Sequence, residues 1–209
     1  MAAASNFILL RDGEVRSVLK GRKTSFRRVV TVPWVKSRRA LPYSPYWVDT
    51  DGKLFACDQY GDYHPATQVL PGWKVGDTLH VKETWAPEPN YEESHDSPDY
   101  DGGGGQADRV VFRADEFPSS GGEPGLSYGV RKWRPSVHMP LWASRILLKV
   151  TEVHIERLHA ITKEGVRSEG FETLSDFQED WNKGPGKKWL ESNWASNPWV
   201  WVTKFRKVG

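Results

Sequence analysis

Apolar residues recur along this chain at spacings that predict short strands and a few helices. Residues 7–10 form an apolar run that predicts a first strand. Apolar side chains three and four positions apart predict a helix over 11–20, and Gly21 fits the left-handed position that ends such a helix. The β-branched run at 29–32 predicts the next strand. The N-terminal part is therefore predicted to be strand, helix, glycine stop and strand.

Four later segments predict further strands. The alternation over 78–83 predicts a strand whose last residue, Glu83, either is exposed or turns into a pocket. Residues 54–57 predict one arm of a hairpin around Asp51-Gly52, and residues 110–113 predict another strand. The segment at 146–155 begins with apolar residues on both faces, which is typical of a central strand.

The C-terminal part predicts two short helices and a closing strand. Thr162 is a good N-cap for a helix over 163–169 that Gly170 ends, and residues 175–178 match the capping box of a second helix. The closing strand over 198–205 places Trp199, Trp201, Thr203 and Phe205 on one face.

Together these elements predict an α+β, mainly β fold. About six strands without regular strand–helix alternation favour a small, partly open β-barrel with short helices at its mouth. At 209 residues the chain fits a single domain over 1–209, with long loop insertions at about 34–73 and 87–130. The second insertion includes an acidic, glycine-rich stretch of low complexity.

Composition narrows the setting in which the protein works. Cys57 is the only cysteine, which excludes an internal disulfide and indicates a reducing compartment. No apolar run approaches the roughly 20 residues of a membrane span, and the first residues lack a secretory signal. We therefore expect a cytoplasmic protein with no membrane association. The eleven tryptophans are interpreted first as core residues and second as surfaces for base stacking.

Charge is balanced overall but unevenly distributed. Lys and Arg number 29 against 27 Asp and Glu, a net charge of +2, while residues 11–39 are basic and residues 88–101 acidic. The segment 21–28 contains four cations and two hydroxyl groups. These groups recognise phosphates and nucleobases, although a solvated basic turn explains the same composition.

Several segments resemble the ASCH domains, a branch of the PUA superfamily with a Gly-x-Lys-x-x-Glu-x-Arg signature. The matching segments are Gly21-x-Lys23 with Arg28, Gly76-Asp77-x-Leu79-x-Val81-x-Glu83, Leu158-His159-Ala160-Ile161-Thr162, Ser168-Glu169-Gly170-Phe171 and Trp199-Val200-Trp201-Val202-Thr203-Lys204-Phe205. Residues 134–145 resemble ASCH-related proteins of bacteriophages and prophages, often labelled "morphogenetic". Order and spacing carry this resemblance, which spans most of the chain outside its two insertions.

The resemblance implies a PUA-like barrel with a cleft for RNA or a nucleoside, in a bacterial or phage-infected cell. Some members hydrolyse the acetyl amide of N(4)-acetylcytidine with a lysine, a threonine three residues later and a glutamate in the short helix. Lys23 and Glu169 match two of these residues, whereas Phe26 stands at the threonine position. The hydroxyl group for such chemistry would have to come from Thr24, Ser25 or a water molecule.

The candidate site residues follow from these two lines of argument. For catalysis they are Lys23, Thr24, Ser25 and Glu169, and for nucleic-acid binding Gly21, Arg22, Arg27, Arg28, Trp142 and Arg145. Two of these assignments have structural alternatives. Lys23 and Glu169 also fit a salt bridge between helix and strand, and Arg145 fits either a phosphate contact or an ion pair with Glu83. No metal site and no cofactor are expected, because His138 has no ligand partner at the required spacing.

Three hypotheses of function remain at this stage. The first is a binding module for RNA or a nucleotide, with Lys23, Arg28 and Trp142 at the barrel mouth. The second is an amidohydrolase that acts on an acylated nucleoside such as N(4)-acetylcytidine. The third is a phage accessory protein that works through protein contacts, which a large exposed apolar patch away from Lys23 would favour.

Overall fold

The protein is described from a computed structural model. The structure describes residues 6–30, 46–49, 53–57, 63–69, 71–87, 110–115, 133–183 and 192–208. Most of the predicted strands and helices lie in these ranges. Much of the two predicted insertions lies outside the described residues, as does the Asp51-Gly52 turn.

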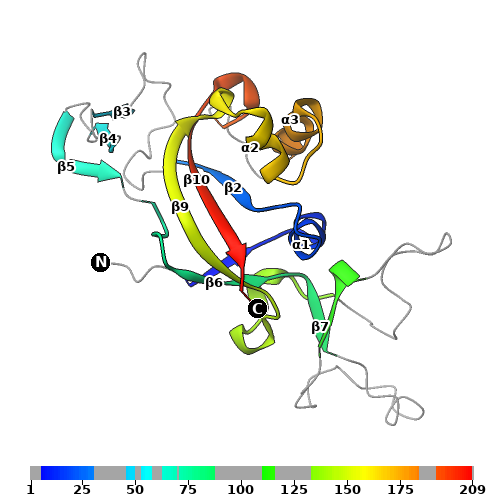
Figure 1. Ribbon diagram of the computed structural model, residues 1–209. Coiled ribbons are helices and arrows are strands. Elements are labelled where there is room, and N and C mark those ends of the chain that lie inside the picture. Colours follow the sequence, from blue (N-terminus) through cyan, green and yellow to red (C-terminus); the bar gives the residue numbers. More distant parts are fainter. Residues whose placement is uncertain are drawn as a thin grey trace, which may run out of the picture.

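A mixed five-stranded sheet forms the centre of the molecule (Figure 1). Its strands, in spatial order, are β1 (Phe7–Leu9), β6 (Thr78–Lys82), β9 (Leu147–Arg157), β10 (Trp199–Lys207) and β2 (Ser25–Val29). The edge pair β1–β6 is parallel, and the other neighbours are antiparallel. With its few short helices the protein is α+β and mostly strand, which confirms the predicted class. Strand β9 lies in the middle of the sheet, as its apolar start predicted.

The main core lies on one face of this sheet. Leu79 and Val81 of β6 are fully buried there, as the alternation of that strand predicted. Helix α1 (Asp12–Leu19) contributes Val15 and Val18 to the same cluster, and Gly21 follows it with a φ of 69°. In the described part of the chain β1 and β2 form the two edges, and no closed barrel is present.

Two helices cover part of the opposite face. Helix α2 (Lys163–Ser168) begins where the Thr162 hydroxyl accepts a hydrogen bond from the Gly165 amide at 3.1 Å, which confirms the predicted N-cap. Val166 and Phe177 pack with Val200 and Val202 of β10, so these strand residues face the helices. The tryptophans of β10 lie on the other side, in a cluster with Val30 and Leu54. Alternation along β10 is therefore as predicted.

Smaller elements surround the main sheet. β3 (Tyr46–Val48), β4 (Leu54–Cys57) and β5 (Tyr63–Val69) form an antiparallel sheet, and β7 (Trp85–Pro87) pairs with β8 (Val110–Phe112). The predicted hairpin is confirmed in its strands, since Val48 lies opposite Leu54. The further single-turn helices are η1 (Arg113–Asp115), η2 (Ser136–His138), η3 (Leu141–Ala143), η4 (Leu158–Ala160) and η6 (Trp194–Ser196).

Three expectations about these elements were wrong. The second strand starts at Ser25 and not at residue 29, so half of the basic segment lies inside β2. Helix α3 (Leu174–Lys183) is capped by Thr173, whose hydroxyl accepts from the Asp176 amide at 3.1 Å, and not at Ser175. The insertion at 34–73 contains strands β3 to β5, where the sequence predicted an irregular segment with one hairpin.

Among the described residues no helix is long and apolar enough to cross a membrane.

Candidate functional site at the junction of β2 and α2

The start of β2 lies against the end of α2. Lys23 and Glu169 form an isolated antiparallel bridge, and the Thr24 amide donates to the Ser168 carbonyl at 2.7 Å. Gly170 follows with a φ of 92°, a left-handed conformation that ends α2 and keeps Glu169 beside Lys23. Backbone hydrogen bonds therefore bring together two candidate residues that are far apart in sequence.

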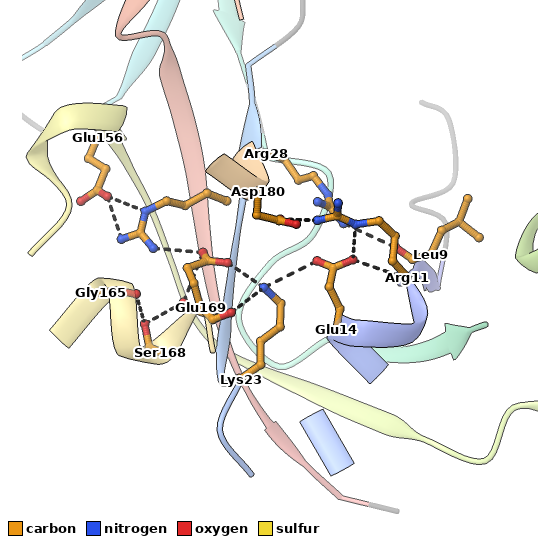
Figure 2. A network of polar contacts seen from close by, with 12 residues as sticks. Leu9, Arg11, Glu14, Lys23, Arg28, Glu156, Gly165, Ser168, Glu169 and Asp180 are labelled. Carbon is orange, nitrogen blue, oxygen red and sulfur yellow. Dashed lines mark hydrogen bonds and ion pairs between the residues drawn. The ribbon is translucent and has the colours of Figure 1, made fainter. Parts of the chain in front are cut away.

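Three side chains from the short segment 23–27 converge on the Glu169 carboxylate, and Figure 2 shows Lys23 beside it. Lys23 Nζ lies 2.7 Å from Oε2, Arg27 Nη1 lies 3.0 Å from Oε1, and the Ser25 hydroxyl lies 3.4 Å from Oε1. The exposed fractions of Lys23, Ser25 and Glu169 are 4%, 0% and 5%. The candidates Lys23, Ser25, Arg27 and Glu169 thus form one buried hydrogen-bonded cluster, hereafter the Glu169 cluster.

Further polar groups complete the Glu169 cluster. Arg27 Nε donates to Glu156 Oε1 at 2.9 Å, and Glu14 Oε1 lies 3.6 Å from Lys23 Nζ. The Ser25 and Ser168 hydroxyls are 2.8 Å apart, and Ser168 in turn donates to the Gly165 carbonyl at 2.8 Å. Arg11 Nε lies 3.5 Å from Glu14 Oε2, so each of the three carboxylates has a cationic partner, which is the condition for burying charges at tolerable cost.

The Glu14 carboxylate shows how strongly this neighbourhood favours negative charge. Burial opposes its charged form, but attraction to Lys23, a hydrogen bond from the Arg11 amide and the charge of Arg28 outweigh burial. The pKa of Glu14 therefore lies below its ordinary value. The Arg11 amide donates to Glu14 Oε2 at 3.0 Å, which fixes this carboxylate at the start of α1.

The remaining candidates of the basic segment are exposed. Arg22 and Thr24 alternate with the buried residues, and both are exposed. Arg28 is also exposed; its guanidinium donates to the Leu9 carbonyl at 3.4 Å and lies 5.6 Å from the centre of the Phe26 ring. Of the two hydroxyl candidates, Ser25 therefore reaches the Glu169 cluster and Thr24 does not.

Phe26 belongs to the main core and not to the site. Its side chain is 1% exposed, and its ring lies 5.3 Å from Trp73 and 5.4 Å from Phe205, centre to centre. Side chains alternate across a strand, so a hydroxyl at position 26 would face the core. The position that the resemblance assigns to a threonine thus points away from Glu169.

Arg145 and Trp142 lie outside the Glu169 cluster. Arg145 binds both oxygens of the fully buried Glu83 at 2.9 Å, donates to Asp115 at 2.6 Å and lies 4.1 Å from the Phe112 ring centre. The ion pair with Glu83 is therefore the alternative that the structure supports. Trp142 on η3 is 64% exposed, and no described contact joins it to Lys23.

Sequence reasoning missed three residues of the cluster: Glu14, Glu156 and Ser168. Glu14 lies in the first turn of α1, where an acidic residue is explained by the helix dipole alone. Glu156 follows Glu152 and His154 at alternate positions of β9, and this polar row was a usable signal that one face of the strand is not core.

No group of three or more metal-ligating side chains occurs among the described residues. Comparisons with protein-family models, with curated proteins and with solved structures found no match to this chain.

Proposed function

We propose that this chain is an ASCH-type, PUA-like protein that binds RNA or a nucleotide beside the Glu169 cluster. Two contacts support the partly open barrel of that architecture. Arg28 on one edge strand of the main sheet reaches the Leu9 carbonyl on the other at 3.4 Å. Helix α1 inserts Val15 and Val18 into the cluster formed by both edges. These contacts support a sheet whose two edges approach each other near α1.

One observation carries the binding proposal: a single short segment contains both buried and exposed polar residues. Lys23, Ser25 and Arg27 are buried against Glu169, whereas Thr24 between them and the flanking Arg22 and Arg28 are exposed. The buried contacts hold the backbone of the segment, so two guanidiniums and a hydroxyl extend into solvent from fixed Cα positions. Guanidinium groups bind phosphate oxygens with two parallel hydrogen bonds, and hydroxyls donate to the same oxygens.

Fluorescence anisotropy with a labelled single-stranded RNA tests this proposal. We expect the wild-type protein to bind and the Arg22→Gln/Arg28→Gln variant to bind at least tenfold more weakly. Loss of two phosphate contacts should also reduce the slope of log K against log salt by about 1.4, at about 0.7 for each contact with a single strand.

The matched control is Lys163→Gln/Lys183→Gln, which removes the same charge from exposed positions on α2 and α3. This variant should bind as the wild type does. Absence of RNA binding by the wild type, or an equal loss in both double variants, would refute the proposal.

A specific contact favours hydrolysis of an acylated nucleoside as the second candidate. Ser25 supplies a hydroxyl 3.4 Å from Glu169 Oε1, while Lys23 binds the other oxygen of the same carboxylate. The Ser25 oxygen would add to the acetyl carbonyl carbon, its proton passing through Glu169 to the leaving amine. Water would then release acetate from the acyl-serine and restore the hydroxyl. Because Ser25 is fully buried, substrate must first displace side chains around it.

Adjacent hydroxyls provide the test of this second candidate. The wild-type protein is incubated with N(4)-acetylcytidine, and cytidine is measured by chromatography. Ser25→Ala should abolish release, and Thr24→Ala should leave it unchanged because Thr24 lies outside the cluster. No release by the wild type, or equal release by both variants, would rule out Ser25 as the nucleophile.

A further inference from the structure

A second surface of the main sheet carries exposed cations next to the Glu169 cluster. The face that α2 and α3 cover at Val200 and Val202 continues beyond the helices towards the end of β10. There Lys149 of β9 lies directly opposite Arg206 of β10, and both side chains are exposed. Their neighbours Leu148, Val150 and Phe205 are buried in the core on the other face. Alternation therefore places the two cations on the open outer face.

Towards the end of β10, cations outnumber carboxylates on this face. Within the described residues neither Lys149 nor Arg206 forms an ion pair. Lys204, two positions before Arg206 on β10, is exposed and binds Glu152 Oε2 at 2.8 Å. Adjacent unpaired cations repel each other, so an anionic partner that neutralises both is favoured.

Apolar and ring-bearing side chains border the cations. Phe7 of β1 lies beside His80 of β6, and His80 lies opposite Leu147 of β9. All three are partly exposed, and the Lys82 ammonium lies 4.4 Å from the centre of the Phe7 ring. A row of rings and apolar groups beside cations is the composition with which proteins bind bases and phosphates of single strands.

The outer face is continuous with the proposed site. Lys204 lies directly opposite Ser25 across the β10–β2 ladder, and the Phe205 amide donates to the Thr24 carbonyl at 2.9 Å. Cross-strand partners share a face, so Lys204 lies about 5 Å from Ser25 of the Glu169 cluster on the same side of the sheet.

We propose that this outer face, defined by Phe7, His80, Lys149, Lys204 and Arg206, is the track for a single-stranded RNA whose end or loop reaches the Glu169 cluster. The inference rests on the proposed function and names its ligand: a polynucleotide, and not a free nucleotide. Phosphates lie on Lys149 and Arg206, and a base lies against Phe7 and His80. Lys204 exchanges Glu152 for a phosphate.

Neutralisation of the two unpaired cations tests the track. Lys149→Gln/Arg206→Gln should weaken binding of a short single-stranded RNA about 25-fold at ~0.1 M salt and lower the salt slope by about 1.4. Binding of cytidine monophosphate, measured by calorimetry, should stay unchanged, because that ligand ends at Arg22 and Arg28. Lys149→Arg/Arg206→Lys keeps the charges and should retain the RNA affinity. Lys163→Gln/Lys183→Gln is again the matched control.

The outcomes separate this inference from the proposed function. RNA affinity of Lys149→Gln/Arg206→Gln equal to that of the control would overturn the track and leave the site beside Glu169 intact. RNA affinity no greater than that of cytidine monophosphate would also overturn it. Failure of the wild type to bind either ligand would reject the proposed function and, with it, the track.

Discussion

Lys23 Nζ lies 2.7 Å from Glu169 Oε2, although 146 positions of sequence separate the two residues. Both side chains are almost completely buried, so neither charge is compensated by water. In such a pair, removal of one partner costs more than removal of both, because the remaining charge stays buried and unpaired. The pair therefore joins α2 to β2 and makes the two elements depend on each other.

A double-mutant cycle measures this dependence. Lys23→Met should lower the free energy of unfolding by about 3–5 kcal/mol, because it leaves the Glu169 carboxylate with one cation fewer. Lys23→Met/Glu169→Gln should be less destabilised than the sum of the single changes, with a coupling of about 1–3 kcal/mol. Urea denaturation of the four proteins gives these values. Additive single changes would show that the contact is not energetically important.

Phe26→Thr tests whether the resemblance can be restored by one substitution. The change removes a ring that packs between Trp73 and Phe205, so the free energy of unfolding should fall by about 3–5 kcal/mol. It should create no hydrolase activity, since the new hydroxyl faces the core. Phe26→Leu is the control and should cost less. Acetylcytidine hydrolysis that appears only in Phe26→Thr would contradict the placement of this residue.

Gly170 and Gly21 both have a positive φ but differ in the space around them, so their substitutions by alanine can be compared. A Cβ at Gly170 would lie 3.3 Å from the Ser17 Cβ and 3.4 Å from the Lys23 Cβ, at a φ of +92°. A Cβ at Gly21, with a φ of +69°, would meet nothing within 4 Å. Gly21→Ala should therefore cost about 1 kcal/mol of backbone strain, and Gly170→Ala distinctly more. Thermal unfolding of both variants checks the order, which equal costs would refute.

The raised pKa of Glu83 predicts how the stability of the folded protein changes with pH. Burial raises it above the ordinary value of 4.5, and the hydrogen bonds and charge of Arg145 offset burial only in part. Between 4.5 and the raised pKa the folded protein binds more protons at Glu83 than the unfolded chain does. The stability contributed by this group is therefore complete below 4.5 and is lost as pH rises through the raised pKa.

Glu83→Gln isolates this contribution. Denaturation curves of wild type and variant, recorded well below and well above pH 4.5, should show the wild type losing stability relative to the variant as pH rises. Glu14→Gln serves as the comparison, because the lowered pKa of Glu14 predicts loss of wild-type stability as pH falls below 4.5. If the free energy of unfolding of the wild type instead rises relative to that of Glu83→Gln with increasing pH, the Glu83 pKa is not raised and the account is wrong.

Local patterns were sufficient for much of the fold. Alternation placed Leu79 and Val81 in the core, a run apolar on both faces placed β9 at the centre, and Thr162 with Gly170 set the ends of α2. Each of these signals depends on residues a few positions apart. For the same reason only the resemblance pairs Lys23 with Glu169, since no local pattern relates residues 146 positions apart.

Two kinds of feature were not predicted from the sequence. They are the residue at which β2 starts and the contacts between residues far apart in the chain. A start at residue 29 placed Ser25 outside the strand, whereas β2 begins at Ser25 and directs its hydroxyl towards Glu169. Glu14 joins the cluster from α1, and Glu156 reaches it from β9 across the intervening strand β10, which is a property of the tertiary fold.

A titration of ¹⁵N-labelled protein with cytidine monophosphate tests the central claim, binding beside the Glu169 cluster, most directly. We predict that the largest chemical-shift changes fall on the amides of residues 22–28 and 168–170, and that Arg22→Gln/Arg28→Gln reduces them. No shift changes, or changes confined to the exposed apolar residues Val137, Leu141 and Trp142, would contradict the account.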